Sequence, residues 1–234
     1  MPRAATAAFG ATQGPRVVPG AYSVRLTKGA QVLETKLEVV VDRRAPYGVA
    51  ERRANFEAGM RVHALFGDMS ALVDRIDGAR AAIEARTGAL PQGDELGARL
   101  RGVSGRLEEV KKKVVATKEG GAITGEERIR EHADLLYGAF IQWEGSPAKY
   151  QLDRIDVLRR ELSEVRAEFD RLASTEVRAL DDALRQRNLA PIPATQASLD
   201  LPADGATAVL RCDTLRLIDC VPVQSAGAVA AERD

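Results

Sequence analysis

Residues 17–42 alternate between apolar and polar side chains with the period of two that is typical of a half-buried β-strand. The apolar-face positions are Tyr22, Val24 and Leu26 in a first run, and Leu33, Thr35, Leu37, Val39 and Val41 in a second. Lys28-Gly29-Ala30 lies between the runs as a turn, and Pro19-Gly20 leads into the first. The pattern predicts a β-hairpin. Because two strands cannot bury a core by themselves, we expect this hairpin to be part of a larger β-sandwich.

From Val49 to about Asn188 the apolar spacing changes to steps of three, four and seven residues, the period of amphipathic helices. Turn-forming segments at 87–94, 119–121 and 145–147 divide this region into four helices, two long and two short. The second stripe has the heptad spacing of a coiled coil. The four stripes are Val62, Leu65, Met69, Leu72, Ile76 and Ile83; Leu96, Leu100, Val103, Leu107, Val110 and Val114; Ile129, Ala133, Leu136, Phe140 and Trp143; and Leu152, Ile155, Leu158, Leu162, Val165, Phe169, Leu172, Val177, Leu180 and Leu184. The expected fold class is mainly α: an antiparallel up-down helical bundle with an N-terminal β-hairpin and a small C-terminal β tail.

Local signals refine this expectation. Asp94 is placed to cap the second helix, and Thr124 with Glu127 predicts a capping box for the third. Gly97, Gly102 and Gly105 should weaken the second helix by roughly 1 kcal/mol each, with close helix approach as the compensation. Short connections should make neighbouring helices antiparallel, so that the two short helices cover only one end of the long pair. The hairpin and the tail are then expected to pack at the other end.

The domain division that follows is a linker at residues 1–16, the hairpin at 17–45, the helical bundle at 49–190 and a tail at 194–234. The tail suggests two short strands around RCDTLRLIDC, in which Cys212 and Cys220 flank the turn. Two interpretations stay open for this pair. They form a cross-hairpin disulfide in an oxidising compartment, or they are two reduced thiols.

Composition narrows the function classes. Lys and Arg total 34 and Asp and Glu total 34, so charge favours neither nucleic acid nor an anionic membrane as a partner. No apolar run approaches the roughly 18 residues of a membrane span. The first 15 residues lack the continuous apolar stretch of a signal peptide, so the localisation stays unknown from the sequence.

No residue pattern predicts catalysis, a cofactor or a metal site. His63 and His132 have no carboxylate or histidine at the i±3 or i±4 positions that a helical metal site uses, and the Glu-x-x-His motif of di-iron bundles does not occur. Carboxylates such as those of Asp153 and Asp156 stand beside arginines, which predicts an ion-paired solvated face. The basic run Lys111-Lys112-Lys113 is typical of a helix C-terminus.

One resemblance bears on identity. The strand Val18-Pro19-Gly20-Ala21-Tyr22-Ser23-Val24-Arg25-Leu26-Thr27 resembles the PGTYTVRLT motif in the C-terminal region of bacterial sortilin-like proteins. These are BNR-repeat β-propellers, often labelled glycosyl hydrolases. Leu135-Leu136-Tyr137 and the ending from Ala179-Leu180 to Leu189-Ala190-Pro191-Ile192 also resemble that region, in the same order, over roughly residues 14–193. The resemblance implies an Ig-like hairpin, a helical bundle and an exported or periplasmic parent. No propeller blade or Asp-box repeat is present in this sequence, so no propeller activity transfers to a residue here.

The function expected from these observations is that of a non-catalytic interaction or accessory module, the C-terminal part of a sortilin-like propeller protein. Its partner would be another protein or the missing propeller, and the hairpin should also favour self-association. The alternative is a fragment of a BNR-repeat glycosyl hydrolase whose active site lies in the absent propeller.

Overall fold

The computed structural model describes residues 13–118, 126–192 and 219–221. These residues divide into two compact units. The helices form one unit, which includes residues 13–16, and the strands form the other, which begins at Val17. None of the described helices combines the length and the apolar character that crossing a bilayer requires.

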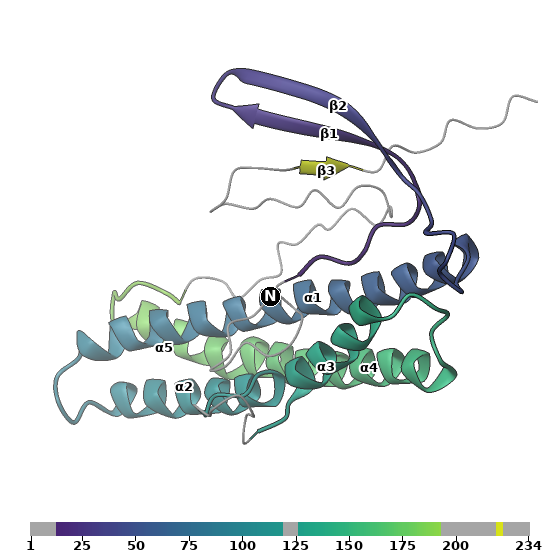
Figure 1. Cartoon of the computed structure of the whole chain (residues 1–234). Coiled ribbons are helices and arrows are strands. Elements are labelled where there is room, and N and C mark those ends of the chain that lie inside the picture. The colour runs from purple at the N-terminus through teal and green to yellow at the C-terminus, as the bar shows by residue number, and fades with distance from the viewer. Residues whose placement is uncertain (1–12, 119–125, 193–218, 222–234) are drawn as a thin grey trace, which may run out of the picture. The chain divides into compact units, whose positions relative to one another are not determined.

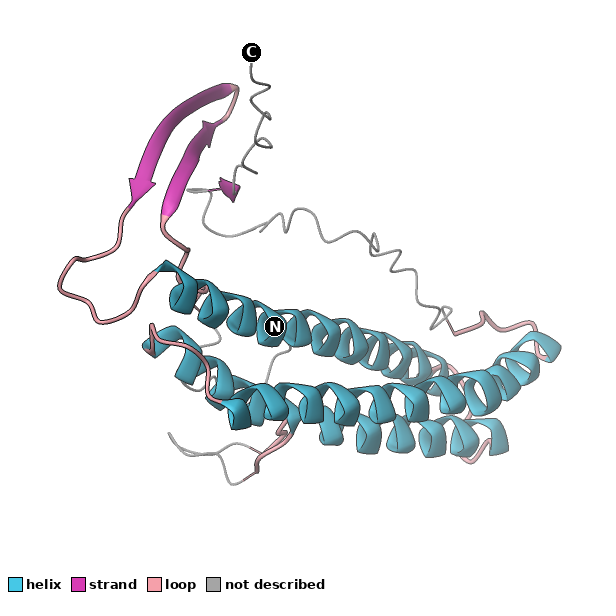
Figure 2. Cartoon of the chain, turned by 90° about the vertical axis from the view of Figure 1, so that its right-hand side faces the viewer, coloured by secondary structure: helices cyan, strands magenta, loops and turns pink. Residues whose placement is uncertain are grey.

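The sheet unit is a hairpin with a third, short strand. β1 (Gly20–Lys28) and β2 (Gln31–Val39) pair antiparallel, from Lys28 opposite Gln31 at the turn to Gly20 opposite Val39 at the open end. Gly29 has a φ of 58°, the left-handed conformation that tight hairpin turns require. β3 (Asp219–Val221) pairs antiparallel with the other side of β1, so the strand order is β2-β1-β3. Figure 2 shows these strands. The predicted hairpin and its turn are confirmed.

The helical unit contains the two short and two long helices that the apolar stripes predict. α1 (Val49–Gly88) is 40 residues long, α2 (Glu95–Val114) 20 and α3 (Ile129–Gln142) 14. α4 (Lys149–Leu172) continues without a break through the π-helical turn η1 (Ala173–Val177) into α5 (Arg178–Gln186). The Oγ atoms of Ser174 and Thr175 both donate to the carbonyl of Arg171 at 3.0 and 2.8 Å. Hydroxyls that compete in this way for a helical carbonyl favour a local departure from α-helical hydrogen bonding.

The two short helices lie end to end rather than side by side. Lys111 of α2 binds Asp77 in the second half of α1 at 2.7 Å, whereas Asn55 in the first turns of α1 donates to the carbonyl of Phe140 in α3 at 2.8 Å. The expectation that both short helices cover one end of the long pair is therefore wrong. The connection from 115 to 128 is long enough for α3 to continue in the direction of α2 instead of turning back.

α1 and α4 run in the same direction. Arg61 pairs with Asp156 at 2.5 Å and, further along both helices, Arg75 pairs with Asp170 at 3.0 Å. The bundle therefore has three rows: α1, then α2 followed by α3, then α4 with η1 and α5 (Figure 1). Each end of the long pair is covered by one short helix.

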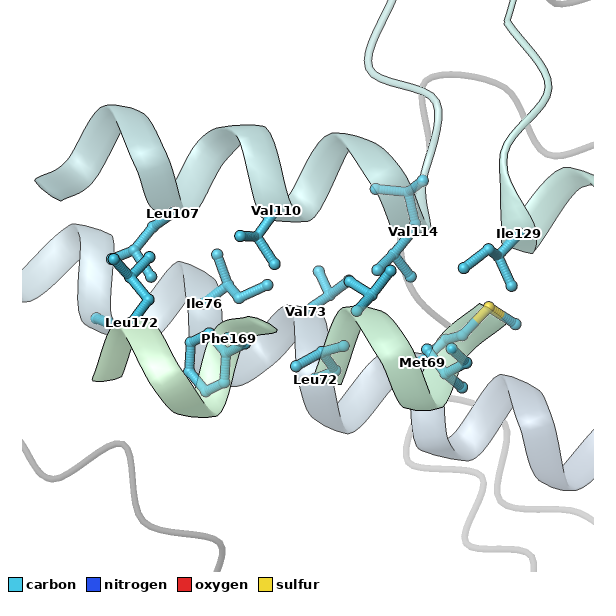
Figure 3. Close-up of a cluster of buried hydrophobic side chains, with 14 of the residues drawn as sticks. Met69, Leu72, Val73, Ile76, Leu107, Val110, Val114, Ile129, Phe169 and Leu172 are labelled. Atoms are coloured by element: carbon cyan, nitrogen blue, oxygen red, sulfur yellow. The ribbon is translucent and has the colours of Figure 1, made fainter. Parts of the chain in front are cut away.

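The core consists mainly of the predicted stripes, with Phe66, Val73 and Tyr137 among the further buried residues. All six stripe residues of α1 and all six of α2 are buried. Figure 3 shows where they meet, with Leu107 and Val110 of α2 beside Ile76 of α1 and Leu172 of α4. Two predicted stripe residues are less buried. Leu152 of α4 is partly buried, and the ring of Trp143 is half exposed because α3 ends at Gln142 and the backbone of residue 143 is extended.

The start of α3 also differs from expectation. Thr124 lies outside the described residues, and the helix begins at Ile129. Glu131, rather than Glu127, supplies the capping carboxylate. Its Oε2 accepts the N–H of Arg128 at 3.2 Å and the N–H of Ala116 at 3.1 Å. The predicted cap of α2 is confirmed, since Asp94 accepts the N–H of Leu96 at 2.8 Å.

The buried stripe of α4 makes the first testable prediction. Leu162→Ala should lower the free energy of unfolding by about 2 to 5 kcal/mol, because it leaves a cavity in the core. Leu135→Ala is the control, since that side chain on α3 is 47% exposed and its loss should cost less than about 0.5 kcal/mol. Urea denaturation followed by circular dichroism measures both. Equal costs for the two variants would contradict the stripe assignment.

The glycines of α2 lead to the second testable prediction. A Cβ at Gly102 or Gly105 would meet no atom within 4 Å, so the expected close helix approach is wrong for these two positions. Gly102→Ala and Gly105→Ala should each raise the free energy of unfolding by about 0.5 to 1 kcal/mol, because alanine restricts the unfolded chain and favours the helix. Gly93→Ala should lower it, because Gly93 has a φ of 88°. Thermal unfolding of the three variants checks this, and a lower melting temperature for Gly102→Ala would refute it.

Candidate interaction surface

One face of the β1–β2 hairpin is largely apolar, with Thr35 as the polar residue in its middle. The register places Tyr22 opposite Leu37, Val24 opposite Thr35 and Leu26 opposite Leu33. Because side chains alternate between the faces of a strand, all six point to the same side. Leu33 is 65% exposed and Leu37 is 52% exposed. Leu33 faces Leu26 and Leu37 faces Tyr22, so the exposed leucines extend an apolar patch across both strands. Exposed apolar patches of this kind are typical of interaction surfaces.

The opposite face of the hairpin is polar except for Val32 of β2 and Ala21 of β1. Its side chains on β2 include Val32, Glu34, Lys36 and Glu38, and Arg25 of β1 binds Glu34 at 2.5 Å. Both partners of this ion pair are more than half exposed, so it contributes little stability. The hairpin thus has two unlike faces, as is common in antiparallel sheets that are covered on one side.

The two long edges of the hairpin also differ. β3 covers the edge of β1 over three residues, where Ser23 is opposite Val221 and Arg25 is opposite Asp219. Within the described part of the chain, β2 is the terminal strand of the sheet and no strand pairs with its outer side. An edge of this kind presents unpaired N–H and C=O groups to any chain that can add a strand.

The structure describes only one of the two cysteines of the predicted disulfide. Cys220 lies in β3 opposite Val24, while Cys212 lies outside the described residues. The choice between a disulfide and two thiols therefore stays a prediction from the sequence.

In the helical unit, the ionisable side chains mostly pair with one another. Asp153 binds Lys149 at 2.6 Å and Asp156 binds Arg61 at 2.5 Å, which confirms the predicted ion-paired face. The lysines of the basic run pair with carboxylates in the same manner: Lys111 with Asp77, Lys112 with Glu109 and Lys113 with Glu168, all at 2.6 or 2.7 Å. These contacts offset the charge of the basic run and join α2 to both α1 and α4.

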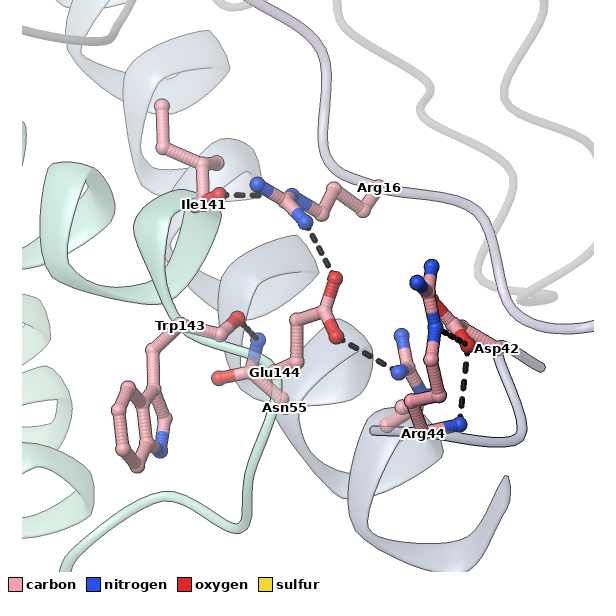
Figure 4. A network of polar contacts seen from close by, with 8 residues as sticks. Arg16, Asp42, Arg44, Asn55, Ile141, Trp143 and Glu144 are labelled. Atoms are coloured by element: carbon pink, nitrogen blue, oxygen red, sulfur yellow. Dashed lines mark hydrogen bonds and ion pairs between the residues drawn. The ribbon is translucent and has the colours of Figure 1, made fainter. Parts of the chain in front are cut away.

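Polar side chains near the end of α3 join segments of the chain to one another. Asn55 donates to the carbonyls of Phe140 and Trp143, both at 2.8 Å, and so satisfies two carbonyls at the end of α3. Nearby, Glu144 binds Arg16 at 2.5 Å and Arg52 at 2.6 Å (Figure 4). Each of these side chains is engaged with main chain or with an opposite charge, as a structural joint requires.

The two histidines lie in different settings. His63 packs near Tyr137, with ring centroids 6.3 Å apart, and burial lowers its pKa. His132 lies 3.7 Å from Glu127. In the described residues, no three His, Cys, Asp or Glu side chains are grouped to hold a metal ion.

A cavity of about 330 Å³ lies between α2 and the η1–α5 segment. Its lining includes Arg99, Gly102, Arg106, Glu176 and Leu180. Arg106 and Glu176 form an ion pair with each other across this region, so their charges are largely offset. The cavity therefore offers a weaker basis for recognition than the apolar face of the hairpin.

Comparison of the chain with protein-family models, curated proteins and solved structures finds no match. The candidate surface is accordingly defined by its own geometry. Sequence alternation identified the apolar face of the hairpin, whereas it did not identify the pairing of β3 with β1. Main-chain pairing over three residues leaves no pattern in the side chains from which it could be predicted.

The lowered pKa of His63 makes a prediction about pH. The folded state binds the His63 proton less well than the unfolded state, so this residue destabilises the fold as pH falls below its ordinary pKa of 6.5. His63→Gln should reduce the loss of stability between pH 7 and pH 5. Urea midpoints measured across this range test the effect, and the pH dependence above pH 7.5 serves as the control because His63 is neutral there in both states. An unchanged slope below pH 7 would contradict the prediction.

Proposed function

We propose that this chain is a non-catalytic interaction module whose hairpin binds a β-rich protein surface through its apolar face. The observation that carries this proposal is the exposure of Leu33 and Leu37, side by side with Tyr22 and Leu26, on one face of the hairpin. Full burial of one leucine side chain contributes roughly 1.5 to 3 kcal/mol, so this face holds a substantial share of a binding energy.

A sheet is the partner that this geometry suits. Sandwich sheets pack face to face about 10 Å apart, with the inward side chains of both sheets interdigitating. The hairpin supplies one such inward face, three side chains deep on each strand. Its resemblance to the Ig-like segment of sortilin-like proteins supports the same partner, because in that family a β-propeller precedes this segment.

In this proposal, the helical unit is an accessory domain. Its apolar stripes are buried against one another within the same chain, so they need no cover from the hairpin's partner. The alternative, a fragment of a BNR-repeat glycosyl hydrolase, places the chemistry in a propeller and predicts the same docking face here. Hydrolytic activity of the assembled propeller separates the two.

The test begins with the genomic DNA upstream of the Met1 codon, where we expect propeller repeats in the same reading frame. That segment, expressed as a separate polypeptide, should bind this chain in isothermal titration calorimetry. Leu33→Thr should weaken binding at least about tenfold, because about 1.4 kcal/mol of apolar burial corresponds to a factor of ten.

Val32→Thr is the matched control, since it changes an exposed apolar side chain of the same strand on the opposite face. Its affinity should equal that of the parent chain. Absence of propeller repeats upstream would refute the sortilin-like assignment. Equal losses for Leu33→Thr and Val32→Thr would refute the apolar face as the binding surface.

A further inference from the structure

The outer edge of β2 is unpaired within the described residues, and the proposed function does not involve it. β2 is nine residues long and, within the described residues, forms one margin of its sheet. Every residue from Gln31 to Glu38 is exposed. The edge is therefore long, regular and accessible, which is the condition for strand addition.

We propose that β2 pairs antiparallel with β2 of a second copy of this chain, about a two-fold axis at Thr35. Thr35 is the midpoint of the strand, so this register pairs all nine residues, from Gln31 opposite Val39 onward. A two-fold axis repeats each pairing twice. The joined hairpins form one continuous sheet.

The side chains of β2 are complementary to themselves in this register. On the polar face, Glu34 of each copy lies opposite Lys36 of the other. On the apolar face, Leu33 of each copy lies opposite Leu37 of the other, so two leucines that are more than half exposed in one chain cover each other. Opposite charges and apolar side chains in directly facing positions stabilise antiparallel pairs, and like charges in those positions destabilise them.

Neighbouring registers lose this complementarity. Sliding one strand by two residues places Lys36 opposite Lys36 and Glu34 opposite Glu38, or else Glu34 opposite Glu34. Parallel pairing in register also places like charges together. Larger slides shorten the overlap. The charge order along β2 therefore selects the antiparallel pairing with full overlap.

An ion pair within the hairpin adds to this charge complementarity. Arg25 of β1 already binds Glu34 at 2.5 Å. With Lys36 of the second copy on its other side, Glu34 lies between two cations across three strands. Leu33 and Leu37 take part both in this interface and in the proposed function. Glu34 and Lys36 project from the opposite face and belong to this interface alone, so they test it separately.

The test is charge reversal with a mixing control, on the full chain, by sedimentation velocity at physiological salt. The parent chain should sediment as a reversible dimer. Lys36→Glu and Glu34→Lys should each raise the dimer dissociation constant about tenfold or more, because both attractive pairs become repulsive. An equimolar mixture of the two variants, with one fluorescently labelled, should restore dimers, since every facing pair is again Glu with Lys. Circular dichroism confirms that each variant is folded.

Three outcomes would overturn the proposal. The parent chain sediments as a monomer at every concentration tested; or it dimerises and both charge variants dimerise equally well; or the mixture of variants fails to regain the affinity that each variant lost. If dimerisation instead responds to Leu33→Thr and ignores both charge reversals, the copies associate through their apolar faces and the edge pairing is wrong.

Discussion

Burial of the apolar stripe of α1 is the constraint on which the helical unit depends. The stripe extends from Val62 to Ile83, and Asn55 and Ala58 prolong the buried side toward the start of the helix. The parallel helix α4, with η1 and α5, covers one side of it. A third row is needed along the same length, and no single helix of 20 or 14 residues is long enough to supply it. The end-to-end arrangement of α2 and α3 solves this problem.

That arrangement creates a weak point where α2 ends and α3 begins, because two helix termini with unsatisfied main-chain groups lie in the interior of the bundle. Glu131 resolves it. The carboxylate is buried and accepts N–H groups from Ala116, which follows α2, and from Arg128, which precedes α3. Its other oxygen lies 3.2 Å from the guanidinium of Arg130. A buried negative charge is tolerated when it is paired and hydrogen-bonded in this way.

The burial of the stripes could be predicted from the sequence, whereas the end-to-end arrangement of α2 and α3 and the role of Glu131 could not. The stripes were predictable because burial of a helix face depends on periodicity and not on which partner covers it; Leu107 and Phe169 are buried whatever the topology. The position of α3 depended on the length of the 115–128 connection, and the role of Glu131 depended on an N–H fifteen residues away in another segment. The apolar face of the hairpin followed from alternation alone. The exposure of Leu33 did not, because it depends on which strands are present to cover it.

The two units therefore differ in the burial of their apolar side chains. In the helical unit, each apolar stripe meets another stripe of the same chain, and the arginines around the core meet carboxylates on neighbouring rows, as Arg75 does with Asp170 while its guanidinium lies over the ring of Phe169 at 4.6 Å. In the sheet unit, the apolar residues of β2 lie on a strand whose residues from Gln31 to Glu38 are all exposed. Exposed apolar area on a regular strand lowers the free energy of any complex that covers it, whereas the same area inside the bundle contributes only to folding. In the proposed function, recognition therefore belongs to the hairpin, whereas the buried stripes stabilise the helical unit.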